Sequence, residues 1–337
     1  MEEMQEILSQ HGYQCKEFLG SGSFSSVYLC ESSKYHQQFA VKKAIKHKLS
    51  AYEYNSLISL NHPHIVQLYD SFEDDNWRYL VTEYCPNGTI LKKKKLSFDY
   101  FVYYARQILD ALSFCHLHKI AHRDIKPENI FIDQYDHVKL ADFGLARQFE
   151  DKRKSTEKCG SLIFFAPEMF ECNEICPFKA DIWALGITFF FMATGDLPFK
   201  TNSIEELKKW VIYGDLEFID NNIDPQIHYL IRKMTNKDPK KRPTAEKLLK
   251  LPMFEPIAAK KTSLFMNQTA RRNSYTTGIT IQSNLETNKS LNMFRNRYID
   301  DPTDTKKQNF QNCILTYRKI YFPILQRKTL RNISRPM

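Results

Sequence analysis

The sequence predicts an α+β fold of two lobes, a small β-rich N-lobe with one helix followed by a larger, mainly helical C-lobe. Residues 13–85 contain short runs such as FAVKKAI and WRYLVTEYC, whose β-branched and aromatic residues are typical of strands. From residue 98 onward, apolar residues recur with a helical period. The Pro-Asn-Gly turn at residues 86–88 separates these two patterns and marks the expected boundary between the lobes.

The N-lobe is expected over residues 13–85, after an N-terminal extension of residues 1–12. Its helix is predicted at residues 50–60, where apolar residues recur at helical spacing. Ser50 and Glu53 resemble a capping box at the start of this helix. The residues that share its predicted packing face are Tyr54, Leu57 and Ile58.

The C-lobe is expected over residues 89–254 and consists mainly of helices. A long helix is predicted at residues 98–118. A second helix, at residues 179–195, is apolar almost all round, which predicts that it is buried. Shorter helical patterns follow at residues 203–214, 227–235 and 245–250.

The composition is ordinary for a soluble globular protein, with 42% hydrophobic and 26% charged residues. The longest apolar stretch, residues 184–193, is too short to span a bilayer, and the acidic residues 1–10 lack a signal-peptide pattern. The eight cysteines are scattered, which favours reduced thiols. We therefore expect an intracellular protein without a membrane span, located in the cytoplasm or also in the nucleus.

Residues 255–337 differ from the rest of the chain in charge. They contain 15 Lys and Arg against 5 Asp and Glu, a net charge of +10, so the chain's total of +9 leaves −1 for residues 1–254. We predict a basic, mostly disordered tail with a docking segment at residues 311–333. Such a tail could attract acidic proteins, RNA or anionic lipid, but a solvated extension is the commoner case, and we expect no nucleic-acid partner.

A glycine-rich stretch, LGSGSFSSV, occupies residues 19–27. Gly20 and Gly22 allow the backbone to turn tightly and to approach a phosphate group without a Cβ in the way. Lys42 follows on a later predicted strand, where its ammonium group could reach phosphate oxygens. Each feature alone is more often an ordinary loop or an exposed lysine.

The strongest chemical signal is HRDIKPEN, residues 122–129, followed by Asp-Phe-Gly from Asp142. Asp124 can accept a hydroxyl proton, and Lys126 can neutralise charge on a transferred phosphoryl group. Asn129 and Asp142 carry oxygens of the kind that Mg²⁺ prefers. Alone, each residue is an ordinary cap, turn or surface residue, but at these spacings and after the glycine-rich stretch they predict phosphoryl transfer.

These motifs make residues 13–254 resemble the eukaryotic protein kinases, with the landmarks in order. The resemblance implies ATP and Mg²⁺ as cofactors. It assigns catalysis to Asp124, Lys126 and Asn129, and metal binding to Asn129 and Asp142. It assigns ATP binding to Leu19, Gly20, Ser21, Gly22, Ser23, Phe24, Ser25, Ser26, Val27, Ala40, Lys42, Glu53, Thr82, Glu83 and Cys85. It assigns structural roles to Glu168, Asp181 and Arg242, with Asp181 bracing the catalytic loop and Arg242 buried against Glu168.

Within the ATP site, the resemblance implies that Lys42 holds the α and β phosphates and that Glu53 forms an ion pair with Lys42. Thr82 is at the gatekeeper position, and the hinge at residues 83–85 would bind adenine through its backbone. The adenine pocket would be lined by Val27 and Ala40.

The type of kinase follows from a few further residues. Lys126 and Ser161 fit the serine/threonine branch, and residues 62–72 and 159–168 resemble the calcium/calmodulin-dependent-kinase-like group. The implied activity is transfer of the γ-phosphate of ATP to serine and threonine hydroxyls of protein substrates. By analogy with this group, the tail could be an autoinhibitory or calmodulin-binding segment.

The chain departs from the family pattern at two positions of the expected ATP site. Ser25 replaces the third glycine, which predicts weaker closure over ATP. Glu53 follows Lys42 by only eleven positions, so its carboxylate could serve either the ion pair or the cap with Ser50. We favour the ion pair, because Glu53 and Leu57 share a helix face. These departures leave a pseudokinase scaffold, which binds partners without catalysis, as the alternative function.

A third departure lies in the expected activation segment. Glu157 stands three residues before Gly160, where many relatives carry an activating phosphothreonine. We predict that Glu157 supplies a constitutive negative charge to Arg123. Phosphorylation of Ser155 or Thr156 by an upstream kinase would add a stronger partner for this arginine.

Overall fold

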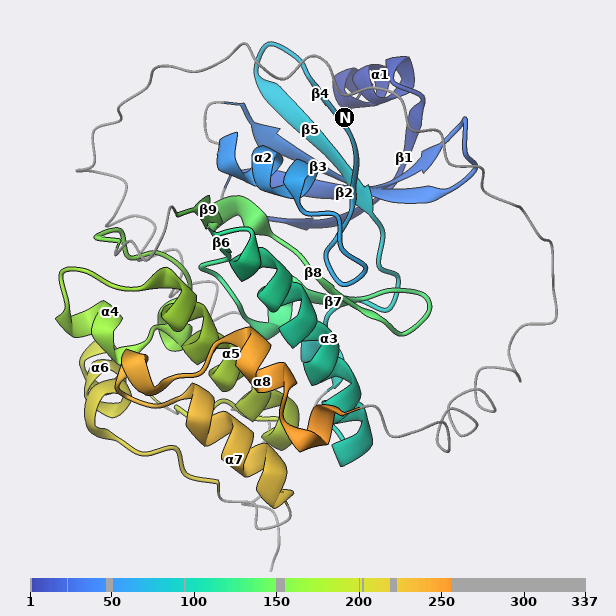
Figure 1. The fold of residues 1–337 in the computed structure, drawn as a ribbon. Helices are drawn as coiled ribbons and strands as arrows, with labels where there is room; N and C mark the ends of the chain where they lie inside the picture. Colours follow the sequence, from blue (N-terminus) through green and yellow to red (C-terminus); the bar gives the residue numbers. More distant parts are fainter. Residues whose placement is uncertain are drawn as a thin grey trace, which may run out of the picture. The chain divides into compact units, whose positions relative to one another are not determined.

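The structure is a computed structural model, shown in Figure 1. It describes residues 2–22, 24–46, 51–93, 95–149, 155–199, 201, 203–218 and 223–255, without the side chains of residues 2, 51–53 and 55. Residues 1–255 form one compact unit. The predictions of a disordered tail and of a docking segment at residues 311–333 lie outside the described residues, apart from Glu255.

The N-lobe is built on a sheet of five antiparallel strands in the order β1-β2-β3-β5-β4. The strands are β1 (Tyr13–Ser21), β2 (Ser25–Ser32), β3 (Gln38–Ile45), β4 (Leu68–Glu73) and β5 (Trp77–Glu83). The helix predicted at residues 50–60 is α2 (Ala51–Ser59), between β3 and β4.

The predicted packing face of α2 was partly wrong. Leu57 is buried and Tyr54 is half-buried, but Ile58 is exposed over half of its surface. Among the described side chains of this segment, the buried ones are Ser56, Leu57 and, just beyond the helix, Leu60. Adjacent helical residues differ by about 100° in direction, so a face centred between Ser56 and Leu57 turns Ile58 towards solvent.

Helix α1 (Glu2–Gln10) lies within the segment that we treated as an extension. Met4 and Leu8 are buried in one hydrophobic cluster with residues of the sheet. The sheet residues of this cluster are Tyr13, Cys30, Phe39, Val41, Phe72, Tyr79 and Val81. The His11 ring stacks on Phe72 at a centroid distance of 3.8 Å. A helix this short is marginal in isolation, so packing against the sheet stabilises it.

The C-lobe is mainly helical, as predicted. Helix α3 (Phe98–Leu117) corresponds to the predicted long helix, and α5 (Pro177–Thr194) to the predicted buried one. Every residue of α5 from Asp181 to Ala193 is buried. The remaining α-helices are α4 (Pro167–Glu171), α6 (Ile204–Tyr213), α7 (Pro225–Met234) and α8 (Ala245–Leu249). Helix α8 packs on α3, and α7 packs on α5.

The C-lobe also contains short strands, which flank the segments that carry Asp124 and Asp142 (Figure 1). Strand β6 (Ile120–Ala121) pairs with β9 (Arg147–Gln148), and β7 (Ile130–Ile132) pairs with β8 (Val138–Leu140), both antiparallel. The short 3-10 helices are η1 (Ile90–Lys93), η2 (Pro127–Asn129), η3 (Phe143–Leu145), η4 (Leu162–Phe164), η5 (Pro239–Lys241) and η6 (Pro252–Phe254). Because β6, β7, β8 and β9 are short and paired, the loops between them have fixed ends.

Two expectations from composition can be compared with the described part of the chain. No helix there is long and apolar enough to cross a bilayer. Seven of the eight cysteines are described, each as a free thiol.

Candidate active site

The loop after β6 is held in place by α5. Asp181 on α5 is buried, and its carboxylate accepts hydrogen bonds from the backbone N–H groups of His122 and Arg123, both at 2.8 Å. The His116 ring lies 3.0 Å from the same carboxylate. Arg123 has a φ of +69°, a conformation that costs free energy in a non-glycine residue. The two hydrogen bonds that the Asp181 carboxylate accepts offset that cost and orient the following residue, Asp124.

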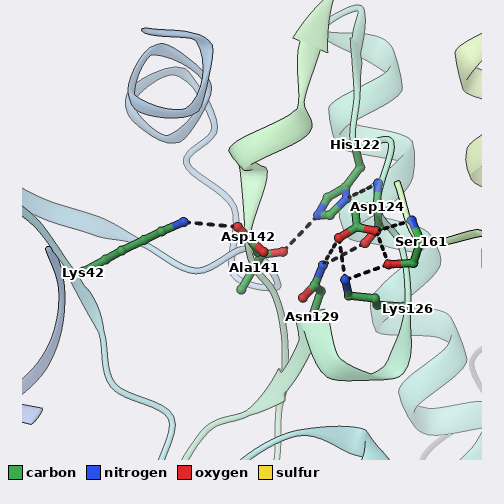
Figure 2. A network of polar contacts seen from close by, with 8 residues as sticks. All are labelled: Lys42, His122, Asp124, Lys126, Asn129, Ala141, Asp142 and Ser161. Atoms are coloured by element: carbon green, nitrogen blue, oxygen red, sulfur yellow. Dashed lines mark hydrogen bonds and ion pairs between the residues drawn. The ribbon is translucent and has the colours of Figure 1, made fainter. Parts of the chain in front are cut away.

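Asp124 lies at the centre of a polar network (Figure 2). Lys126 Nζ donates to Asp124 Oδ2 at 2.6 Å and to Ser161 Oγ at 2.9 Å. The backbone N–H and the hydroxyl of Ser161 donate to Asp124 Oδ1 at 3.0 and 2.9 Å. Asn129 Nδ2 donates to Asp124 Oδ2 at 3.1 Å and to its backbone oxygen at 2.8 Å. Four donors thus occupy the two carboxylate oxygens, which is about the number they can accept.

The protonation state of Lys126 follows from this network. Burial by itself lowers the pKa of Lys126, but the charge of Asp124 and the hydrogen bond to it outweigh burial, so the net pKa is raised. Lys126 is therefore a cation at neutral pH, hydrogen-bonded to the Asp124 carboxylate.

Lys42 and Asp142 lie beside this network. Lys42 Nζ on β3 is 3.2 Å from Asp142 Oδ1, across 100 positions of sequence (Figure 2). The positive charge of Lys42 is the main reason why the pKa of Asp142 is lowered to about 2. Asp142 has a φ of +60°, and the Asp142 side chain is 47% exposed. The residue therefore presents an ionised carboxylate at the surface of the site.

The segment that carries Asp142 is tied to the loop that carries Asp124. His122 Nδ1 accepts from the backbone N–H of Asp124, so His122 Nε2 carries the proton and donates to Ala141 O at 3.0 Å. Ala141 N donates to Asn129 O at 2.9 Å. These bonds fix Asn129 and Asp142 in one local arrangement (Figure 2).

Asn129 and Asp142 suit a magnesium ion that also binds phosphates. Because Asn129 Nδ2 donates to Asp124, the amide oxygen Oδ1 is turned away from Asp124 and is available as a ligand. Asp142 adds an ionised oxygen. Among the described residues, no group of three or more His, Cys, Asp or Glu side chains could hold a metal ion. Magnesium is commonly held by one or two protein oxygens with water and substrate phosphates, so this donor set fits it.

Most of the residues expected to bind ATP lie on β1, β2, β3 and β5 of the N-lobe and in the loop between β1 and β2. In the glycine-rich loop, Gly22 N donates to Ser25 O at 2.8 Å, and Phe24 at the tip is 43% exposed. The Thr82 hydroxyl donates to Ala40 O at 3.2 Å. Burial raises the pKa of the Cys85 thiol to about 12.

Several of the residues expected to bind ATP lie on strands. Two others are not described, or not in their side chains. Leu19, Gly20 and Ser21 are on β1, and Ser26, Val27, Ala40 and Lys42 are on β2 and β3. Ser23 and the side chain of Glu53 lie outside what the structure describes, as does Ser50. The choice between an ion pair and a cap for Glu53 therefore stays a prediction.

The segment before Ser161 contacts Arg123 through Glu157. The Arg123 side chain is only 5% exposed, and its Nη2 lies 3.0 Å from Glu157 Oε2. Arg147 Nε on β9 lies 3.3 Å from the same oxygen. Gly160 has a φ of +108°, and a Cβ there would lie 2.4 Å from Arg123 O, so this close approach requires glycine.

Ser155 and Thr156 differ in their accessibility. The Ser155 hydroxyl accepts from Glu157 N at 3.1 Å and donates to Glu157 O at 3.3 Å, and its backbone pairs with Ile175. Ser155 is buried, whereas Thr156 is exposed.

A second ion pair joins Glu168 and Arg242 away from the Asp124 network. Arg242 Nη1 and Nη2 donate to the two Glu168 oxygens, both at 2.6 Å. Arg242 also donates to backbone oxygens of Asn236 and Lys179 at 2.7 and 2.9 Å. Its guanidinium group lies 5.0 Å from the ring of Trp183, and both charged side chains are buried.

Sequence reasoning missed two residues that contribute to this geometry. Arg147 shares Glu157 with Arg123, and His122 links the two polar loops. Arg147 lies five residues after Asp142, on a strand that pairs with β6 just before Arg123. His122 lies in the HRDIKPEN stretch, but its role could not be read there, because it depends on which backbone oxygen lies opposite its ring.

Comparisons with known proteins agree with this geometry. The family described as "Protein kinase domain" matches residues 13–254. The chain is 35% identical over 254 residues to "Calcium-dependent protein kinase 6" of Plasmodium berghei, with 71% of this chain and 17% of that protein covered. It is 30% identical over 256 residues to "CBL-interacting serine/threonine-protein kinase 15" of Arabidopsis thaliana, with 72% and 61% covered.

A third relative is the "SNF1-like protein kinase ssp2" of Schizosaccharomyces pombe, which is 34% identical over 256 residues, with 72% of this chain and 44% of that protein covered. The chain thus spans less than two thirds of the length of each of these relatives. The matched family covers most of the chain, and the matched residues include every described part of the Asp124 network. The chain belongs to the eukaryotic protein kinases of the serine/threonine type.

Proposed function

We propose that this chain is an active enzyme that transfers the γ-phosphoryl group of ATP to serine and threonine hydroxyls of protein substrates. The observation that carries the proposal is the network in which Lys126, Ser161 and Asn129 all direct hydrogen-bond donors to Asp124. A scaffold without catalysis would not need to hold a carboxylate, a cation and a free amide oxygen in one place.

The occupancy of Asp124 suggests how a substrate hydroxyl enters. Its carboxylate already accepts four hydrogen bonds, so an incoming hydroxyl must replace one donor. Lys126 is the donor that can leave, because its long side chain can turn to a transferring phosphoryl group. Asp124 would then accept the proton of the hydroxyl, while Lys126 neutralises negative charge on the phosphoryl oxygens.

The ATP site would combine residues of both lobes. The hinge backbone at residues 83–85 would bind adenine, Val27 and Ala40 would contact its faces, and Lys42 would contact phosphate oxygens. Asn129 Oδ1 and the Asp142 carboxylate would hold Mg²⁺. When bound, the ion would neutralise the phosphate oxygens during transfer.

The activation segment would keep its contact with Arg123 without a phosphate group. Arg123 is a nearly buried cation next to Asp124, and Glu157 already supplies a carboxylate at 3.0 Å. We propose that Glu157 acts as a constitutive partner. An upstream kinase would find the exposed Thr156 more accessible than Ser155, whose hydroxyl is engaged with Glu157.

The basic tail and the cellular location remain proposals from the sequence. A tail of net charge +10 would inhibit the kinase domain or bind a partner protein. The related group suggests calmodulin as that partner. Removal of residues 259–337 tests this, because an autoinhibitory tail predicts higher activity of the shortened protein. We expect the protein in the cytoplasm, where its thiols would stay reduced.

Comparison of the wild type with Asp124→Asn tests the main proposal. Purified protein with radiolabelled ATP, Mg²⁺ and a mixture of protein substrates should incorporate phosphate on serine and threonine. Asp124→Asn should lower the rate about 10²–10⁴-fold, the usual contribution of a general base. Glu246→Gln on α8 removes an exposed carboxylate instead and should have no effect. A wild type that binds ATP but incorporates no phosphate would support the pseudokinase alternative.

A further inference from the structure

One strand of the C-lobe, β8, is paired to two separate segments of the N-lobe side. Leu140 N donates to His64 O at 2.8 Å, and Val66 N donates to Leu140 O at 2.9 Å. Ile65 and Leu140 form a parallel bridge. The segment between α2 and β4 is therefore bonded directly to the backbone of β8.

The second segment is the end of β5, which contacts β8 through an ion pair. Lys139 Nζ lies 2.7 Å from Glu83 Oε1, and the two side chains are only 13% and 19% exposed. Glu83 Oε2 is buried and has no hydrogen-bond partner in the described part of the chain. The Glu83 carboxylate thus depends on Lys139 for the compensation of its charge.

Glu83 also links the two N-lobe segments to each other. Its backbone N–H donates to Gln67 O at 2.9 Å. Gln67 directly follows Val66, which is bonded to β8. The Lys139–Glu83 ion pair and the Val66–Leu140 backbone hydrogen bond therefore hold the same short stretch from two sides.

Polar side chains of α3 and of the segment between α2 and β4 surround the contact between β8 and the N-lobe. His62 Nδ1 accepts from His64 N at 3.1 Å, so the proton of His62 is on Nε2, which faces Asp110 on α3 at 3.5 Å. His64 Nδ1 donates to Val138 O at 3.2 Å. The positive charge of Lys139 acts on His62 as well as on Glu83. We name these residues, His62, His64, Glu83, Asp110 and Lys139, the inter-lobe joint.

We propose that Lys139 is a positioning residue for nucleotide binding, which fixes the hinge backbone at residues 83–85 through its ion pair with Glu83. This inference rests on the proposed function, because that function assigns adenine binding to the hinge. Lys139 itself would not touch the nucleotide. It would hold Glu83, and with it the start of the hinge, at a set distance from β8.

Loss of the Lys139 charge should weaken ATP binding more than it slows phosphoryl transfer. A buried carboxylate without a cation either takes up a proton or turns towards water, and both changes move residues 83–85. Asp124 and its loop are held by Asp181 on α5, which does not depend on this pair. The expected signature is therefore a change in KM for ATP with little change in kcat.

The test uses the full chain with Lys139→Met, which keeps a long apolar side chain and removes the charge. The KM for ATP and the Kd for ATP measured by calorimetry should both rise by about tenfold, while kcat at saturating ATP changes less than about twofold. Lys139→Arg should restore most of the affinity. Lys46→Met is the matched control, because it removes a 2.8 Å ion pair with Glu73 that is exposed and distant from the hinge.

A second measurement needs neither nucleotide nor activity. In the free protein, hydrogen exchange at the Glu83 and Val66 amides should become faster in Lys139→Met than in Lys46→Met. Unchanged exchange and an unchanged KM for ATP would overturn the proposal. A lower melting temperature with an unchanged Kd would also overturn it, since the pair would then only stabilise the fold.

The same experiment separates this proposal from the proposed activity. A wild type that binds ATP without transferring phosphate overturns the proposed activity, while the Kd and exchange measurements still decide the role of Lys139. A wild type that does not bind ATP overturns both proposals.

Discussion

Two ion pairs of this protein, Arg242–Glu168 and Lys42–Asp142, differ in their burial and in the number of partners that their charged groups contact. Arg242 and Glu168 are almost inaccessible, share two hydrogen bonds of 2.6 Å, and Arg242 makes further bonds to backbone oxygens. Lys42 Nζ lies 3.2 Å from Asp142 Oδ1, and the Asp142 side chain is 47% exposed.

The difference separates groups that hold the fold from groups that are available for ligands. The Arg242–Glu168 pair is saturated with partners, so it has no capacity for a ligand, and loss of either member leaves a buried charge. The Lys42–Asp142 pair leaves oxygens of Asp142 open to solvent, so it can bind a cation at little cost. The same kinds of side chain thus stabilise the fold in one place and remain available for chemistry in the other.

The largest expected effect is a loss of folding stability when the Arg242–Glu168 pair is broken. Arg242→Ala should lower the free energy of unfolding by about 3–5 kcal/mol, because it leaves the Glu168 carboxylate buried without its cation. Denaturant unfolding measures this loss. Lys250→Ala, which breaks an exposed 2.6 Å pair with Glu246, should leave the denaturant midpoint almost unchanged. An unchanged melting temperature of Arg242→Ala would contradict the structural role.

Next in size is the effect of Asp142 on activity. Asp142→Asn should lower kcat/KM by about 10²–10³-fold, the usual cost of one preorganised electrostatic contact. Because the side chain is half exposed, the free energy of unfolding should change by less than about 1 kcal/mol. The comparison fails if Asp142→Asn unfolds as readily as Arg242→Ala, or if it keeps wild-type activity.

A smaller effect is expected at Glu157, which combines features of both pairs. Glu157→Gln should lower activity by about tenfold, which corresponds to about 1.4 kcal/mol, since it removes the carboxylate that lies 3.0 Å from the nearly buried Arg123 Nη2. Glu171→Gln, an exposed change on α4, is the control. Wild-type protein treated with phosphatase should keep most of its activity. Complete loss on that treatment would show that Glu157 alone is not sufficient.

The smallest effect is a pH dependence from the inter-lobe joint. Burial lowers the pKa of His62 and of His64 below the usual 6.5, because both rings are removed from water. Stability is then full above pH 6.5 and falls as pH decreases from there towards the lowered values, since the unfolded chain binds protons that the folded one excludes. Melting temperatures of the wild type at pH 7.5 and 5.5 should show this decline.

His64→Asn is the variant that assigns part of this pH dependence. It should reduce the decline between pH 7.5 and 5.5 relative to wild type, because asparagine can keep a hydrogen bond to Val138 O without titrating. An identical decline in the variant would place the titration elsewhere, for example at His228, whose pKa is also lowered by burial and by Arg232.

The sequence predicted most of the architecture because its signals are local. The period of α3 and the apolar surface of α5 identified both helices, and the β-branched runs identified β3 and β5. The failures were α1 and the outward face of α2. Both are set by where another element packs, which a single stretch of sequence does not encode.

The sequence by itself determined which side chains are the candidates for the chemistry of this protein. Asp124, Lys126, Asn129 and Asp142 are close in sequence or follow at short intervals, so their types and spacing indicate phosphoryl transfer without coordinates. Only the tertiary structure decided what each charged group contacts. Glu157 meets both Arg123 and Arg147, and Glu83 meets Lys139, across 10 to 56 positions of sequence. Such partners depend on how strands and loops approach in space, where the cost of burying a charge selects the pairs that form.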